Sequence, residues 1–202
     1  MKKQQNGQYL YSPSDLVRYV DSPFASAMTR LVCEGKIDKS LKNIDDEQAK
    51  LLTSRGFKHE DDLEAKFCSE GKRIIKIKKD KNKEAEAYEQ TLAAMREGYE
   101  VIVQAYLKRD LFAGYADFLI KVDGKSDLGD YHYEVWDTKL AHHIKPTFVI
   151  QLCCYAEMLC AIQGVLSKHI TVALGNQQNI QIKTLDCFAY YDAVKSDFLQ
   201  EQ

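Results

Sequence analysis

The chain has 202 residues, a hydrophobic fraction of 45% and a formal net charge of -2 at pH 7. Its length suits one domain, its apolar content is enough for a buried core, and its near-neutral charge excludes a strongly basic nucleic-acid-binding protein. We see no apolar run of about 18 residues and no secretory signal, so we expect a cytoplasmic protein with no membrane-spanning helix and no membrane partner.

The N-terminal part of the chain predicts helices. Ser12 can act as an N-cap, Pro13 suits the first helical turn, and Asp15 completes an S-x-x-D capping pattern, so a helix should run to about Val20. The next segments are expected to be a second helix from residue 23, a polar loop at 34–46 and a helix that ends at Gly71.

The rest of the chain predicts strands and helices in a mixed order. Strands are expected where β-branched and aromatic residues gather, and helices where strong helix formers or a long apolar run are closed by glycine. The expected strands are 73–79, 99–107, 114–122, 131–140, 169–175 and 179–187, and the expected helices are 83–98, 147–164 and 190–202. This order predicts an α/β fold with a central mixed β-sheet flanked by helices, preceded by an N-terminal helical segment.

The strand expected at 131–140 ends in Asp137-Thr138-Lys139. An acid two residues before a lysine occurs five times in the chain, but only this one ends an apolar strand. Residues i and i+2 of a strand point to the same face, so Asp137 and Lys139 should project together. A surface ion pair at the end of a strand is the simpler alternative.

Asp117 lies on the preceding strand, which a turn of roughly eight residues should make an antiparallel neighbour. Counted back from the turn, Asp117 and Asp137 can come level, roughly 5 Å apart. Two carboxylates this close repel each other, so one takes a proton or a cation sits between them. Oxygen ligands suit Mg²⁺ or Mn²⁺, and with a neighbouring lysine they are the parts needed for metal-assisted hydrolysis of a phosphodiester.

Three further polar residues accompany this pair. His59 precedes the first strand on a helix, where it could add an imidazole ligand or be a solvated helix residue. Gln151 and Tyr155 are four residues apart, so they share one face of an otherwise apolar helix. A core tyrosine with a satisfied hydroxyl is the alternative for Tyr155.

These motifs together resemble a known family. The series G-x-x-H-E, G-x-x-D-F-L, Y-E-x-x-D-T-K-L and Q-L-x-x-Y resembles the RecB-like branch of the PD-(D/E)XK nuclease superfamily, and within it the domains at the amino end of proteins that carry a superfamily 1 helicase. The likeness covers nearly the whole chain. It implies a restriction-endonuclease-like fold and a single nuclease domain over 1–202, with an N-terminal helical segment at 1–45 and a nuclease core at 46–202.

The resemblance also implies roles for individual residues. The expected metal ligands, for Mg²⁺ or Mn²⁺, are Asp117, Asp137, the backbone carbonyl of Thr138 and His59. Lys139 would be the catalytic lysine and would act with the two aspartates, supported by Gln151 and Tyr155. Glu134 matches a family position too, but on its strand it points away from Asp137, so no ligand role is expected for it.

The implied function is a metal-dependent deoxyribonuclease, exonuclease-type, acting in DNA repair, recombination or processing. Its partners would be DNA, as a single strand or a duplex end, and a superfamily 1 helicase in the same or another chain. The alternatives are a non-catalytic nucleic-acid-binding module and a helicase-docking module that keep the fold. The family usually continues beyond such a domain, so a fragment or a stand-alone reduced version is expected.

Two compositional features complete the expectations. The six cysteines are expected to be reduced, buried thiols. Some relatives hold an iron–sulfur cluster with one early and three late cysteines, but only Cys187 lies near this end, so no cluster is expected. Residues 72–83 carry seven positive charges. Of these, Lys72, Arg73, Lys76 and Lys78 are candidates for phosphate contacts, and a lysine-protected edge strand is the alternative.

Overall fold

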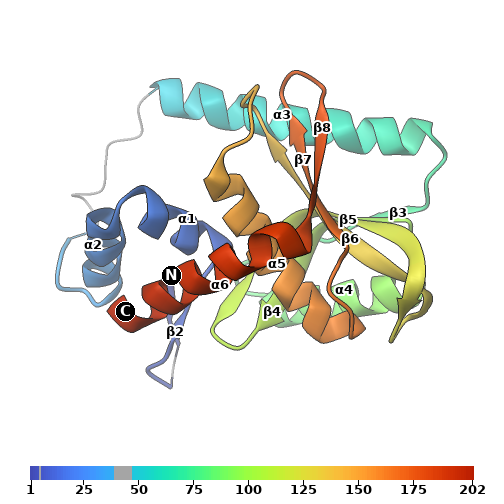
Figure 1. Ribbon diagram of the computed structural model, residues 1–202. Helices are drawn as coiled ribbons and strands as arrows, with labels where there is room; N and C mark the ends of the chain where they lie inside the picture. Colours follow the sequence, from blue (N-terminus) through green and yellow to red (C-terminus); the bar gives the residue numbers. More distant parts are fainter. Residues whose placement is uncertain (5, 39–46) are drawn as a thin grey trace.

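The computed structural model describes residues 1–4, 6–38 and 47–202 (Figure 1). Most of the loop expected at 34–46, and the expected boundary near residue 45, therefore lie outside the described residues. The elements, in chain order, are β1 (Lys2–Lys3), β2 (Tyr9–Leu10), α1 (Pro13–Asp21), α2 (Pro23–Cys33), α3 (Glu47–Ser69), β3 (Ile74–Lys76), α4 (Glu84–Arg96), β4 (Val101–Arg109), β5 (Phe112–Ser126), β6 (Gly129–Lys139), α5 (Pro146–Gln163), β7 (His169–Leu174), β8 (Asn179–Lys183) and α6 (Thr184–Glu201).

The main sheet has the strand order β3-β4-β5-β6-β7-β8. Strands β4, β5 and β6 form an antiparallel meander, and β8 is antiparallel to β7. The pairs β3–β4 and β6–β7 are parallel, and α4 and α5 supply the crossovers that parallel pairs require. The expectation of a mixed sheet flanked by helices is therefore confirmed.

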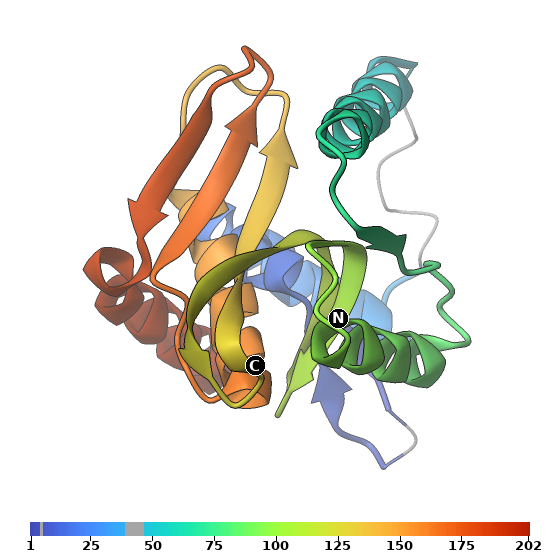
Figure 2. The ribbon, with the colours of Figure 1, turned by 90° about the vertical axis from the view of Figure 1, so that its right-hand side faces the viewer.

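Helices cover both faces of this sheet. Figure 2 shows α3 on one side of β6, β7 and β8, with α6 on the other. On the α3 face, Leu63 and Phe67 pack against Phe118 and Ala173, and the Phe67 ring centroid lies 5.9 Å from those of Phe118 and Trp136. On the opposite face the apolar side of α5 fills the larger core. Each side of the sheet is thus fixed by its own apolar cluster.

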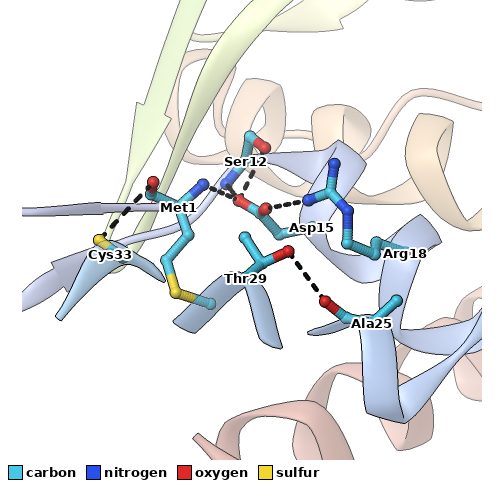
Figure 3. Close-up of polar contacts among 7 residues, drawn as sticks. All are labelled: Met1, Ser12, Asp15, Arg18, Ala25, Thr29 and Cys33. Atoms are coloured by element: carbon cyan, nitrogen blue, oxygen red, sulfur yellow. Dashed lines mark hydrogen bonds and ion pairs between the residues drawn. The ribbon is translucent and has the colours of Figure 1, made fainter. Parts of the chain in front are cut away.

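Helix α1 begins with the capping pattern that the sequence predicts. The Ser12 backbone N–H and hydroxyl each donate to Asp15 Oδ2 at 2.8 Å, and Arg18 Nη1 donates to Asp15 Oδ1 at 3.0 Å. The α-amine of Met1 also forms an ion pair with Asp15, as Figure 3 shows. Leu16, the next residue along the helix, is fully buried in the larger core. These contacts fasten α1 to the body of the protein.

Asp15 makes the stability of the protein depend on pH. Burial favours protonation of its carboxyl, but the hydrogen bond and charge of the Met1 amine and the Ser12 donors outweigh burial and lower its pKa. A lowered folded-state pKa means that the carboxylate stabilises the fold above its unfolded pKa of roughly 3.9, and that this contribution is lost as the pH falls through the folded pKa. Asp15→Asn should therefore cost about 2 kcal/mol of unfolding free energy at pH 7 and much less near pH 3, measured by urea denaturation. An equal loss at both pH values would contradict this account.

Three boundaries differ from the sequence prediction, and one strand pair was not expected. The strand expected at 73–79 is only β3, Ile74–Lys76, because its ladder with β4 stops at Val103. The turn expected between the two site-bearing strands is much tighter, since β5 and β6 continue to Ser126 and Gly129. The strand expected at 179–187 ends at Lys183, where α6 begins, and the short β1–β2 pair was not predicted.

The prediction that no apolar run could span a membrane was wrong as stated. Helix α5 has 18 residues and is apolar enough to cross a membrane by length and composition. Half of this segment is buried inside the fold, however, against the sheet. A helix packed in the core of a fold meets the same criteria of length and composition, and α5 packs in the core here.

The cysteines are less uniformly buried than the sequence suggested. Cys153 and Cys154, both on α5, are fully buried, whereas Cys33, Cys160 and Cys187 are half-buried. Cys68 is exposed near the end of α3, so the prediction of burial was wrong for this residue. Burial raises the pKa of the Cys153 and Cys154 thiols to about 12, which keeps both protonated and unreactive.

Candidate functional site

The hairpin of β5 and β6 brings Asp117 and Asp137 level. Phe118 pairs with Trp136 across this ladder, so the two acids occupy the next opposed positions. There the ladder ends. The Thr138 backbone N–H and hydroxyl each donate to Asp117 Oδ2 at 3.0 Å. The Asp117 carboxylate is thus held against β6 by hydrogen bonds to the residue that follows Asp137.

Asp137 is a buried acid paired with a lysine. It is 2% exposed, and burial, followed by the charge of Asp117, raises its pKa to about 7 even though Lys139 opposes the shift. Lys139 Nζ forms an ion pair with Asp137 Oδ2 at 2.5 Å. A group in this environment is stabilised by a proton or by a cation.

Helix α5 places Gln151 and Tyr155 beside these acids. Gln151 Nε2 lies 3.4 Å from Asp137 Oδ1, and the Tyr155 hydroxyl donates to the Tyr115 carbonyl at 2.7 Å. Burial, followed by the charges of Asp117 and Asp137, raises the pKa of Tyr155 well above its ordinary value. The two side chains share one helix face, as their spacing predicts, and that face meets the acid-bearing strands.

His59 lies at the same level of the sheet but on the α3 side. Its Nε2 atom is 3.1 Å from the carbonyl oxygen of Ala173 on β7. Ala173 pairs with Thr138 across the β6–β7 ladder, so His59 stands two strands from Asp117. Its role as a metal ligand remains a prediction.

Glu60, the residue after His59, has a role in the site that was not predicted from the sequence. Glu60 is buried, and burial, followed by the charge of Asp117, raises its pKa. Its Oε1 accepts a hydrogen bond from Gln104 Nε2 on β4. The motif "KHEDD" contains three consecutive acids. Glu60 is three residues before Leu63 and seven before Phe67, so helical spacing places it on the face of α3 that packs on the sheet.

Gln104 interrupts its strand beside Asp117. By register Gln104 falls opposite Asp117, yet the ladder pairs Val103 with Phe118 and Ala105 with Ala116 and skips the position between. Gln104 has a φ of 57°, a left-handed conformation that non-glycine residues seldom adopt. This strained residue turns its side chain to Glu60, and such strain gathers at functional sites.

Three of the four expected phosphate-binding residues are already paired with acids. Lys72 Nζ lies 3.1 Å from Glu100, and Lys76 Nζ lies 2.7 Å from Glu64. The Arg73 guanidinium stacks over the Tyr99 ring at 4.0 Å and reaches Glu97 at 3.4 Å. Lys78 forms no ion pair within the described residues, so it is the freest cation of the four. All four side chains are exposed.

Glu134 lies away from the acids, as its place on the strand predicts. Its Oε1 accepts the His169 backbone N–H at 2.9 Å and lies 3.2 Å from His169 Nδ1. The carboxylate therefore helps to fix the start of β7 beside β6.

The donor set fits a small divalent cation. Mg²⁺ usually binds to one or two carboxylates and keeps several waters. Asp117, Asp137 and the Thr138 carbonyl supply such oxygens. Within residues 1–4, 6–38 and 47–202, no three His, Cys, Asp or Glu side chains are grouped closely enough to hold a metal ion by themselves. Any cation here would therefore use the two aspartates, backbone oxygen and water.

Comparisons with known proteins add no family assignment. The sequence matches no protein-family model, and a search of curated proteins found no match. The function must therefore be argued from the arrangement of these side chains.

Proposed function

We propose that this chain is a metal-dependent DNA nuclease with a restriction-endonuclease-like fold of the RecB-like type. The observation that carries the proposal is the pair of opposed acids, Asp117 and Asp137, with Lys139 2.5 Å from Asp137 Oδ2. The motifs that resemble the RecB-like branch support it, since most of the residues they single out lie at one end of the β5–β6 hairpin, namely Asp117, Asp137, Lys139, Gln151 and Tyr155.

The proposed cofactor is Mg²⁺ or Mn²⁺. Asp117, Asp137 and the Thr138 carbonyl would hold it together with water, while His59, the further ligand expected from the sequence, lies two strands from Asp117 on the α3 side. A bound divalent cation supplies Lewis-acid chemistry at a phosphate oxygen. The substrate is DNA, as a single strand or a duplex end, and exonuclease-type action in repair, recombination or processing is the proposed role. A superfamily 1 helicase is the proposed partner, and the cytoplasm the proposed location.

The residues of the chain would perform three tasks. Lys139 carries a proton at Nζ beside Asp137, so its ammonium can stabilise negative charge that develops on the phosphate or donate that proton. Gln151, 3.4 Å from Asp137 Oδ1, would orient this carboxylate. Tyr155 stays protonated and hydrogen-bonded to Tyr115, which holds β5 against α5 at the position of the site.

One observation favours a second candidate function. Asp137 is 2% exposed and its Oδ2 is already covered by Lys139, an arrangement that a closed, non-catalytic ion pair would also produce. A nucleic-acid-binding or helicase-docking module that keeps the nuclease fold would show the same geometry.

Cleavage by the purified chain separates these candidates. End-labelled single-stranded and duplex DNA should be degraded in the presence of Mg²⁺ or Mn²⁺ and remain intact in EDTA. An RNA strand of the same sequence tests the choice of nucleic acid. If no substrate is cleaved with either metal although the protein binds DNA, the non-catalytic module is the better account.

A further inference from the structure

A cleft beside the candidate site is lined by an aromatic ring on one side and by lysines on the other. It lies between α3 and the segment that contains β3, and its volume is about 490 Å³. It is lined by Phe57, Glu60, Asp61, Lys76, Ile77, Lys78, Lys79 and Gln104. Pockets of roughly 300–1,000 Å³ are the size that holds small ligands. The cleft therefore has room for a nucleotide-sized group.

Its outer wall carries an exposed aromatic ring. Phe57 is 59% exposed. It precedes Glu60 by three residues on α3, so both side chains lie on one face of the helix. This wall therefore runs from the exposed ring of Phe57 inward to the buried Glu60. Burial, followed by the charge of Asp117, raises the pKa of Glu60.

The opposite wall carries cations. Lys76 forms ion pairs with Glu64 at 2.7 Å and Asp61 at 3.6 Å. The other two lysines that line the cleft, Lys78 and Lys79, are exposed and form no ion pair with any residue that the structure describes. Lys79 Nζ lies 5.9 Å from the centre of the Tyr115 ring. This wall can therefore contact phosphates, while Phe57 faces them across the cleft.

An aromatic surface opposite lysines suits a single nucleic-acid strand. In a duplex the faces of the bases are stacked on one another, so only an unpaired base can lie on a phenylalanine ring. The inner end of the cleft is Gln104, which falls opposite Asp117 by register. A strand held here would be next to the acids of the candidate site.

We propose that this cleft is a base-stacking subsite for single-stranded DNA, in which Phe57 stacks on one unpaired base and Lys78 and Lys79 contact the adjoining phosphates. The proposal deepens the proposed nuclease function and rests on it for the identity of the ligand. It makes Phe57 the residue that distinguishes single strands from duplex.

Phe57→Ala tests the stacking contact, with Phe24→Ala as the matched control. Phe24, on α2, is 74% exposed and does not line the cleft. Affinity for a fluorescent oligothymidylate of about 16 nucleotides should fall about tenfold in Phe57→Ala, the loss expected for one stacked base. It should be restored in Phe57→Trp and be unchanged in Phe24→Ala. Affinity for a blunt hairpin duplex should not change, and a thermal melt checks that each variant is folded.

The lysines are tested by the salt dependence of binding. Lys78→Ala and Lys79→Ala should each reduce the slope of log affinity against log salt for oligothymidylate by about 0.7, the value for one phosphate contact to a single strand. Unchanged slopes in both variants would place the phosphates elsewhere and overturn the proposed orientation.

The outcomes for the subsite and for the nuclease are separable. If Phe57→Ala binds oligothymidylate as well as Phe24→Ala does, or loses duplex and single-strand affinity equally, the stacking subsite is wrong whether or not the wild type cleaves DNA. If binding depends on Phe57 but the wild type cleaves nothing with Mg²⁺ or Mn²⁺, the subsite stands and the nuclease function fails.

Discussion

Asp117→Asn and Asp137→Asn should each remove Mn²⁺ binding and lower metal-dependent DNA cleavage by about a thousandfold or more. The two carboxylates occupy opposed positions across the end of the β5–β6 ladder. An amide keeps the shape but not the charge, and a metal ion contributes several kcal/mol to charge stabilisation, which corresponds to about this factor. Calorimetry with Mn²⁺ and single-turnover cleavage rates measure the two effects.

The fold should survive both changes. Burial and the charge of Asp117 already disfavour the ionised form of Asp137, so a neutral amide there should not destabilise the protein. Asp123→Asn, an exposed acid farther along β5, is the matched control and should leave both measurements unchanged. Normal Mn²⁺ binding in both site variants would place the metal elsewhere.

Lys139→Arg should retain DNA binding and metal affinity but lose cleavage by at least about 10²-fold, the lower end for removal of a general acid–base group. Arginine keeps the positive charge beside Asp137 but lacks the compact ammonium and does not release its proton. Single-turnover rates at saturating Mg²⁺ measure the effect. Lys125→Arg, at the far end of the same hairpin, serves as the control.

Lys139→Ala should lower the cleavage rate to the same degree, but its effect on cleavage is harder to separate from an effect on metal binding. The charge of Lys139 opposes the upward shift of the Asp137 pKa, so its removal makes this acid harder to ionise and can weaken metal binding indirectly. An active Lys139→Arg enzyme would rule out proton transfer by this lysine and leave only its ion pair with Asp137.

Local rules were enough to predict the centre of the candidate site. Alternation along a strand placed Asp137 and Lys139 on one face, and the hairpin placed Asp117 level with Asp137. Helical spacing placed Gln151 and Tyr155 together. Each of these inferences depends only on residues that are close in sequence or joined by a single hairpin.

The parts that could not be predicted depend on distant contacts. The burial of Glu60 results from the packing of α3 on the sheet. The left-handed backbone at position 104 is carried by a glutamine rather than a glycine, so the residue type does not indicate it. The boundary at Lys183 was missed because "NIQIKTLDC" is rich in β-branched residues and Lys183 offers no side-chain cap for α6. Propensity alone favours continuing the strand there.

The tight β5–β6 connection has a consequence for how such a site can diversify. Both acids and the lysine come from one uninterrupted segment, 117–139, whose internal geometry is set by a single hairpin. The elements that surround it, including α3 and its cleft, come from other parts of the chain and meet it through hydrogen bonds and packing. Surrounding segments can therefore lengthen, shorten or change their chemistry over evolution while the reactive centre is inherited as one module, so that selectivity and chemistry are free to evolve separately.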